Sequence, residues 1–297
     1  MTIDDLKNQY LNYLTDYRGR SENTKYAYDF DLTKFISYLA SQKISNPQMV
    51  STKIMETYLF ELGRVNGLST VTKARVRSSI KSFFNFLYRK EFITSNPGIN
   101  LESIKVPEKR PEYLSQEQCS NFIRTIEREA RPYYKTRDLT IAKLLLKSGL
   151  RRAEIVYLNV SDVDLSKLRL RVKRKGGREE YLIIHHELAE DLRKYLKTIN
   201  RGENEPLFLS KRRRRLSASS IWHLVKHYSR LAGLNGDVTV HSLRHTFAST
   251  LLSKSMPLPY IQALMGHKSS QTTSRYLHFQ NTELSKAFNN LSFDEGR

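Results

Sequence analysis

A proline-containing segment at residues 104–113 divides this chain into two parts. Its sequence, IKVPEKRPEY, shows no apolar periodicity and contains Pro107 and Pro111. Proline lacks a backbone N–H and restricts the residue before it to extended conformations, so two prolines disfavour a helix and stiffen a connector. We therefore expect a linker at residues 104–113, between one domain at residues 1–103 and a second domain at residues 114–297.

The part before the linker is typical of a helical domain. Apolar residues recur at helical spacing after Ser21, Ser51 and Ser69, and each serine can cap the start of a helix. The third segment carries four basic side chains: Lys73, Arg75, Arg77 and Lys81. A solvated basic face and a face that contacts DNA explain these side chains equally well.

The part after the linker combines helices with a hairpin. Residues 168–184, LRLRVKRKGGREEYLII, alternate between apolar and polar on both sides of two glycines, which predicts a two-stranded hairpin. Helical patterns occur at residues 115–126, 139–146, 188–196, 218–232, 243–252, 258–264 and 284–291. The whole chain is therefore predicted to be mainly α with a small β-sheet.

The charge of the chain favours a polyanionic partner. Fifty Lys+Arg residues against thirty Asp+Glu give a formal net charge of +20, of which +4 lies in residues 1–103 and +16 in the remainder. Such a field attracts nucleic acid through counterion release, and a solvated basic surface without a partner is the alternative. We favour nucleic acid.

Other classes of protein fit the sequence poorly. No apolar run approaches the ~18 residues that a membrane span needs, and the N-terminus carries Asp4 and Asp5 without a hydrophobic stretch. Cys119 is the only cysteine, which excludes an internal disulfide and a metal site with several thiolates. We expect a cytoplasmic, nucleoid-associated protein with no membrane contact.

Two stretches place basic residues where they can bind or protonate a phosphate ester. In SGLRRAE, Glu154 lies one helical turn after Arg151 and can hold the guanidinium as a rigid fork for phosphate oxygens. A surface ion pair is the simpler interpretation of that motif. In KRKGG, Lys175 lies at the hairpin tip, where it can reach a DNA groove or protonate a leaving oxygen. Hairpin tips are also charged simply because they are exposed.

Two further stretches contribute histidines and a tyrosine. In HSLRHTF, His241 and Arg244 share a helix face. His241 and His245 also have metal-ligand spacing, but no carboxylate is nearby and Arg244 would repel a cation, so we expect no metal there. In MGHKSSQTTSRY, Tyr276 follows His267 by nine residues.

The combination of these residue types fits one chemistry. Metal-free phosphoryl transfer through a covalent intermediate needs a nucleophile, an acid and cationic groups around phosphorus. A tyrosine oxygen can attack phosphorus, a lysine can protonate the departing oxygen, and arginines can neutralise a pentavalent phosphorane. We expect no cofactor, neither a metal nor ATP.

In their order along the chain, these motifs resemble those of the tyrosine site-specific recombinases, the integrase family that includes the Xer proteins. The family's R…K…HxxR…H…Y arrangement is present as Arg151, Lys175, His241, Arg244, His267 and Tyr276. There are two departures. Arg152 stands where members often carry an apolar residue, and KRKGG replaces the commoner GKG, so Lys173 is a rival to Lys175 as the catalytic lysine.

The resemblance spans nearly the whole chain and implies a two-domain fold. Residues 1–103 would form a helical, SAM-like core-binding domain, and residues 114–297 a mixed α/β catalytic domain. The two domains would clamp around DNA like a C. A C-terminal stretch, Thr282–Leu291, would dock on a neighbouring protomer, with packing on its own domain as the alternative.

The resemblance also implies a mechanism. Tyr276 would attack the scissile phosphate to give a 3′-phosphotyrosine link, and Lys175 would protonate the leaving 5′-oxygen. Arg151, Arg244 and His267 would stabilise the phosphorane, His241 would assist as acid/base or by positioning the phosphate, and Glu154 would orient Arg151. Basic residues expected to contact DNA are Lys73, Arg75, Arg77, Lys81, Lys173, Arg174, Arg178, Arg212 and Arg213.

The implied partner is double-stranded DNA with an inverted-repeat core site. One dimer would bind each site, and a tetramer would join two sites through a Holliday junction. The outcome would be resolution of dimers or cointegrates, or movement of a mobile element. Two alternatives remain open: a nicking-closing enzyme like a type IB topoisomerase, and a catalytically silent DNA-binding regulator on the same fold. Accessory proteins are not specified by the sequence.

Overall fold

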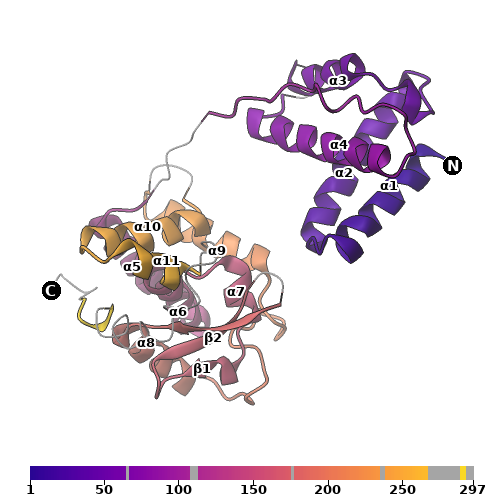
Figure 1. Ribbon diagram of the computed structural model, residues 1–297. Helices are drawn as coiled ribbons and strands as arrows, with labels where there is room; N and C mark the ends of the chain where they lie inside the picture. The colour runs from indigo at the N-terminus through magenta and orange to yellow at the C-terminus, as the bar shows by residue number, and fades with distance from the viewer. Residues whose placement is uncertain (65–66, 108–112, 175–176, 235–237, 267–287, 292–297) are drawn as a thin grey trace. The chain divides into compact units, whose positions relative to one another are not determined.

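The chain forms two compact units, each with its own hydrophobic core (Figure 1). The computed structural model describes residues 1–64, 67–107, 113–174, 177–234, 238–266 and 288–291. The division between the units falls at residues 109 and 110, inside the segment expected to be a linker. Within the described ranges, no helix is long and apolar enough to cross a membrane.

The N-terminal unit is helical. Its elements are α1 (Ile3–Asn12), the π-helix η1 (Tyr13–Tyr17), α2 (Glu22–Ser41), the 3-10 helix η2 (Pro47–Met49), α3 (Thr52–Arg64) and α4 (Thr70–Arg89). Helices α2, α3 and α4 begin one residue after Ser21, Ser51 and Ser69, as predicted. Helix α4 contacts the three other α-helices and buries Phe83 and Phe84 completely among them.

The four basic side chains of α4 make contacts inside this unit. The Arg75 guanidinium forms an ion pair with the buried carboxylate of Asp31. Arg77 donates to the backbone carbonyls of Leu101 and Glu102, and Lys81 Nζ donates to the carbonyl of Ile99. Lys73 lies beside Gly63, where a Cβ would meet its Nζ at 2.8 Å. These contacts fix residues 99–102 on α4, and a DNA contact for the four side chains stays a prediction.

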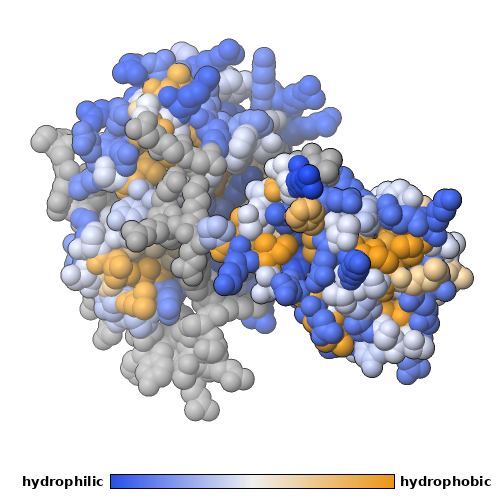
Figure 2. Space-filling view, turned by 90° about the horizontal axis from the view of Figure 1, so that it is seen from above, coloured by the Kyte–Doolittle hydropathy of each residue, from blue (hydrophilic) through white to orange (hydrophobic). Residues whose placement is uncertain are grey.

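Exposed apolar side chains interrupt the hydrophilic surface of this unit. In Figure 2, which shows one face of the molecule, hydrophobic patches lie among hydrophilic side chains. Phe30 and Phe60 are exposed. The ammonium group of Lys34 lies 4.3 Å from the ring centroid of Phe30, a cation–π contact that covers part of this apolar surface.

The C-terminal unit is built around helix α6. Its helices are α5 (Gln116–Glu129), α6 (Pro132–Ser148), α7 (Arg152–Tyr157), η3 (Val160–Asp162), α8 (His186–Lys197), α9 (Ala218–Leu231), α10 (Val240–Ser253) and α11 (Leu258–Met265). Helix α6 contacts α5, α8, α9 and α10, and Ile141, Leu144 and Leu145 are fully buried between these neighbours. Ser115 caps α5, as its sequence predicts.

A small antiparallel sheet lies beside α7 (Figure 1). Its strands, in the order β1-β2-β3, are β1 (Val163–Asp164), β2 (Arg169–Lys173) and β3 (Glu179–Ile183). The predicted hairpin is confirmed, with Lys173 paired to Glu179 next to the turn. The short strand β1 was not predicted, because two residues carry no readable alternation.

The described part of the C-terminal tail packs on its own unit. Phe288 is fully buried, and its ring centroid lies 5.5 Å from that of His185 and 6.1 Å from that of Phe247. The backbone N–H of His186 donates to the side-chain oxygen of Asn289. Residues 282–287 lie outside the described chain, so docking of the tail on a neighbouring protomer stays a prediction.

Candidate active site

Arg151 and Glu154 meet at the start of α7. The Arg151 backbone N–H donates to Glu154 Oε2 over 2.8 Å, and Arg151 Nη1 lies 2.9 Å from Glu154 Oε1. The Arg151 side chain is 39% exposed, whereas that of Glu154 is 4% exposed. The carboxylate therefore holds the guanidinium from the protein side, and part of the guanidinium faces solvent, where a phosphate can approach.

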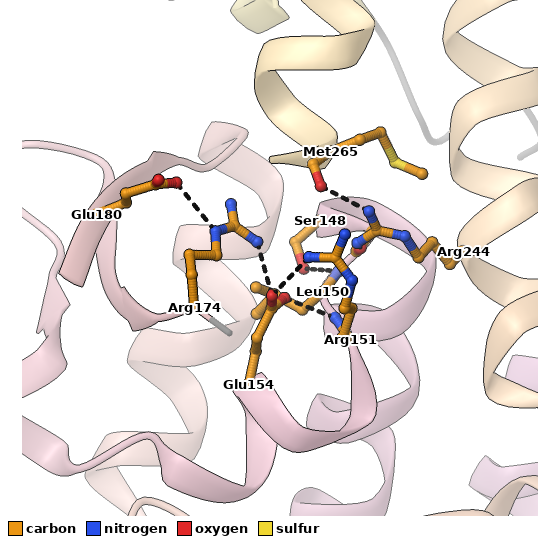
Figure 3. A network of polar contacts seen from close by, with 9 residues as sticks. Ser148, Leu150, Arg151, Glu154, Arg174, Glu180, Arg244 and Met265 are labelled. Atoms are coloured by element: carbon orange, nitrogen blue, oxygen red, sulfur yellow. Dashed lines mark hydrogen bonds and ion pairs between the residues drawn. The ribbon is translucent and has the colours of Figure 1, made fainter. Parts of the chain in front are cut away.

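Arg244, on α10, joins two loops that are far apart in sequence. Its guanidinium is buried and donates to the backbone carbonyls of Gly149 and Met265. Figure 3 shows the contact with Met265. Gly149 precedes Arg151 by two residues, and Met265 precedes His267 by two residues. Arg244 thus ties the end of α6 to the end of α11 and brings the segments before two predicted catalytic residues together.

Gly149 allows this close approach. It ends α6 in the left-handed conformation, with φ at +61°. A Cβ at this position would lie 2.5 Å from a ring carbon of Phe247 and 2.9 Å from the sulfur of Met265. Only glycine fits both the backbone conformation and the space.

Arg174 also reaches the cluster, from the turn end of β2. Its Nη1 lies 3.0 Å from Glu154 Oε1, and its Nε donates to Glu180 Oε2 over 3.1 Å (Figure 3). Its side chain is 9% exposed. The sequence predicted a DNA contact for Arg174, but this burial leaves little of the guanidinium for DNA, and a different role is proposed below.

The electrostatics of the cluster favour an anion. Burial, together with the nearby Arg151 guanidinium, lowers the pKa of Arg244 to about 10, while Glu154 partly compensates. Burial alone would raise the pKa of Glu154, but the Arg151 backbone N–H and the Arg174 and Arg151 guanidinium groups outweigh it, so the pKa lies below its ordinary value. Arg151 and Arg174 form ion pairs with Glu154 and Glu180, whereas Arg244 donates to backbone carbonyls, so three guanidinium groups face two carboxylates and the excess positive charge attracts a phosphate.

His241 lies one turn before Arg244 on α10. Helix α10 begins with a capping box between Thr239 and Ser242, which places His241 in its first turn. Partial burial, then the neighbouring His245 and Arg244, lower the pKa of His241 below its ordinary value. The neutral ring can therefore accept or donate a proton near neutral pH.

The structure describes three of the six predicted catalytic residues. Arg151 and Arg244 are brought together through Glu154 and Gly149, and His241 lies on the same helix as Arg244. Lys175, His267 and Tyr276 lie outside the described residues. The residues directly before two of them are described, because Arg174 precedes Lys175 and Gly266 precedes His267.

The remaining residues predicted to bind DNA are exposed. Lys173 and Arg178 flank the hairpin turn, and Arg212 and Arg213 belong to the KRRRR stretch after Ser210. Arg215, the last arginine of that stretch, points inward and donates to the carbonyls of Val156 and Leu158 and to the side chain of Asn159. The stretch therefore divides into an exposed part and one structural arginine, and its DNA contacts stay a prediction.

A group of metal-capable side chains occurs elsewhere in the C-terminal unit. Among the described residues, possible ligand atoms of His185, His186 and Glu187 lie within 4.8 Å of one another. Glu187 forms an ion pair with Lys147 over 2.8 Å, and the His185 ring packs against Phe288. These contacts show that Glu187 and His185 pack between α6, α8 and the tail, so we assign no metal to this group.

The sequence did not predict the contacts of two arginines in this cluster. Nothing local indicated that Arg244 would donate to backbone carbonyls or that Arg174 would reach Glu154. The positions of two glycines could have indicated that these segments meet. Gly149 and Gly266 each end a helix in the left-handed conformation, shortly before a predicted catalytic residue. A helix-ending glycine marks a sharp turn, and both turns converge on this site.

Comparison with known proteins identifies the family. The family described as Phage integrase family matches residues 112–283, and the domain described as Phage integrase, N-terminal SAM-like domain, matches residues 8–91. The chain belongs to the phage integrase family. The predicted recognition and fold class, helical core-binding domain plus mixed α/β catalytic domain, are thereby confirmed.

Relatives within the phage integrase family cover almost the full length of the chain. Tyrosine recombinase XerD of Staphylococcus epidermidis is 32% identical over 285 residues, which is 94% of this chain and 96% of the relative. Tyrosine recombinase XerC of Herpetosiphon aurantiacus is 34% identical over 278 residues, 92% of this chain and 90% of the relative.

Solved structures of the family share the fold. The structure of XerH site-specific recombinase bound to palindromic difH substrate, a post-cleavage complex, superposes with a TM-score of 0.71. That comparison covers 95% of this chain and 83% of the XerH chain, at 22% sequence identity.

Proposed function

We propose that this chain is a site-specific DNA recombinase that cuts and rejoins DNA strands through a 3′-phosphotyrosine intermediate. The observation that carries the proposal is the cationic cluster in a phage integrase fold, in which Glu154 holds Arg151 while Arg244 joins the ends of α6 and α11 through backbone carbonyls. Similarity to the XerC and XerD tyrosine recombinases supports this function over a topoisomerase-like or catalytically silent alternative.

The proposed chemistry assigns a role to each candidate residue. The Tyr276 oxygen attacks the scissile phosphorus, the bond to the 5′-oxygen breaks, and Lys175 gives that oxygen its proton. Arg151, Arg244 and His267 stabilise the charge that develops on the phosphoryl oxygens, and His241 assists as acid/base or by positioning the phosphate. Because the covalent link keeps the energy of the phosphodiester, rejoining needs no ATP.

We further propose a paired arrangement on DNA. Two protomers bind an inverted-repeat core site, and two such sites join into a tetramer that passes through a Holliday junction. The palindromic substrate of the XerH structure, which shares this fold, supports a repeat of this kind. The net charge of +20 supplies the sequence-independent part of DNA affinity.

Trapping of the covalent intermediate tests the function. Fragmented genomic DNA is incubated with the protein, and DNA that stays attached in detergent defines the site. A nicked suicide duplex of that site then loses its short 5′-hydroxyl strand after cleavage, so adducts accumulate.

The wild type is expected to form adducts, whereas Tyr276→Phe binds the duplex with unchanged affinity and forms none. Tyr157→Phe serves as the matched control, because Tyr157 is exposed on α7 and should keep full activity. Adducts with Tyr276→Phe would disprove the nucleophile assignment, and the absence of adducts with the wild type would disprove the function.

A further inference from the structure

Arg174 closes the turn of the β2–β3 hairpin with its backbone. Its N–H donates to the carbonyl of Arg178 over 2.7 Å, and its carbonyl accepts from the N–H of Gly177 over 3.1 Å. These two bonds enclose residues 175 and 176. Whatever fixes Arg174 therefore also holds Gly177 and Arg178, the described residues that follow the turn.

The side chain of Arg174 attaches this turn to the active-site cluster. Its Nη1 pairs with Glu154 of α7 and its Nε with Glu180 of β3, so one planar group bridges two elements. Glu154 Oε1 is also the atom that Arg151 Nη1 contacts over 2.9 Å. The hairpin is thus held to the same carboxylate oxygen that holds the phosphate-binding arginine.

A third contact comes from the end of α11. Gly266 adopts the left-handed conformation, and a Cβ there would lie 2.4 Å from the Arg174 Cζ and 2.6 Å from its Nη2. The guanidinium therefore lies directly against the Gly266 backbone. Carboxylates from two elements and the backbone of a third surround it, which explains its 9% exposure.

A buried, doubly paired cation is costly to move, because it would have to leave its partners or take them with it.

We infer that Arg174 is a positioning residue for Lys175, holding the hairpin turn against Glu154 so that the lysine can protonate the leaving 5′-oxygen. The inference rests on the proposed function. Positioning of a general acid is worth about 10²–10⁴-fold in rate, so loss of the anchor should slow strand cleavage by a substantial part of that factor.

A substrate whose leaving group needs no protonation tests whether Arg174 acts through Lys175. In a suicide duplex with sulfur in place of the bridging 5′-oxygen, the leaving group departs as a stable thiolate, and the general acid contributes little. Arg174→Gly, which removes the whole anchoring side chain, is expected to cleave the ordinary duplex about 10²-fold more slowly than the wild type. On the sulfur duplex its rate should lie within about tenfold of the wild type.

Further variants distinguish positioning of Lys175 from a role of Arg174 in DNA binding or folding. Arg174→Lys keeps the charge but has a single nitrogen, so it cannot span Glu154 and Glu180, and it should show a smaller loss with the same selectivity. Arg178→Ala removes an exposed arginine from the same turn and should leave the ratio of the two rates unchanged. Glu180→Gln weakens the anchor without touching Arg174, which tests the inference independently if Arg174→Gly folds poorly.

Two results would overturn the inference while leaving the proposed function intact. Equal slowing of Arg174→Gly on both duplexes would mean that the residue serves DNA binding or folding, and an unchanged rate on the ordinary duplex would mean that the anchor is unimportant. A wild type that cleaves neither duplex would overturn the proposed function and the inference with it, so the two failures are distinguishable.

Discussion

Replacing Gly149 by alanine tests the packing that brings Arg244 to the active-site cluster. Gly149 lies at φ +61°, and an added Cβ would meet the Phe247 ring at 2.5 Å. The left-handed conformation costs an alanine roughly 1–2 kcal/mol, and overpacking a core typically costs about 1–3 kcal/mol. Since Phe247 is fully buried, its ring has little room to move, and Gly149→Ala should lose about 2–5 kcal/mol of unfolding free energy.

Gly233→Ala is the matched control. Gly233 has φ +63°, but no heavy atom lies within 4 Å of an added Cβ. It should therefore show only the backbone cost of roughly 1–2 kcal/mol. The difference of about 1–3 kcal/mol between the two variants isolates the clash with Phe247 and Met265.

Tryptophan fluorescence can report the unfolding of the C-terminal unit alone. Trp222 is the only tryptophan and lies on α9, so its fluorescence follows unfolding of the C-terminal unit in the full chain. Urea titrations of the wild type and both variants give the free energies directly. Gly149→Ala should also form fewer covalent adducts, because the Gly149 carbonyl accepts from Arg244. Equal stability of the two variants would refute the packing argument.

Three further outcomes are expected. Since the pKa of Glu154 lies below its ordinary value of 4.5, its ionised form stabilises the fold above that pH and this stabilisation is lost on acidification. The unfolding free energy of the wild type should therefore fall more steeply below pH 4.5 than that of Glu154→Gln, and parallel curves by Trp222 fluorescence would contradict this. Because the pKa of His241 lies below its ordinary value of 6.5, its ring in the free protein should take up a proton only below that pH, as followed by the NMR resonances that are lost in His241→Gln. A ring that is already half protonated above pH 6.5 would contradict the shift. Phe288→Ala should cost the free protein about 3–5 kcal/mol, whereas the exposed Phe60→Ala should cost at most about 0.5 kcal/mol. A Phe288→Ala variant as stable as the wild type in urea would show that the tail leaves its own unit in solution.

The features that could be predicted from the sequence depend on residues that lie close together in the chain. Serines located the starts of α2, α3 and α4, although the side chain of Ser21, unlike those of Ser51 and Ser69, makes no capping hydrogen bond. The alternation around two glycines located β2 and β3, because such patterns depend on neighbours within a few residues. The pairing of Arg151 with Glu154 was readable for the same reason, since the two lie three residues apart at the start of one helix.

Contacts between segments that lie far apart in the chain could not be predicted from such local patterns. The sequence left a solvated face and a DNA contact equally open for Arg75 and Arg77, but it did not indicate their partners inside the unit, which are Asp31 and the carbonyls that follow α4. Arg174 looked like one of several exposed cations at a hairpin tip, and its burial depends on Glu154 and Gly266, which only the tertiary fold brings near. Charge alone does not distinguish a solvated arginine from one with a buried partner.

One oxygen atom of Glu154 serves two arginines. Glu154 Oε1 contacts Arg151 Nη1 at 2.9 Å and Arg174 Nη1 at 3.0 Å. A carboxylate oxygen has two lone pairs, so it can accept from both guanidinium groups at once. Loss of this single carboxylate would therefore deprive both the start of α7 and the end of β2 of an anchor.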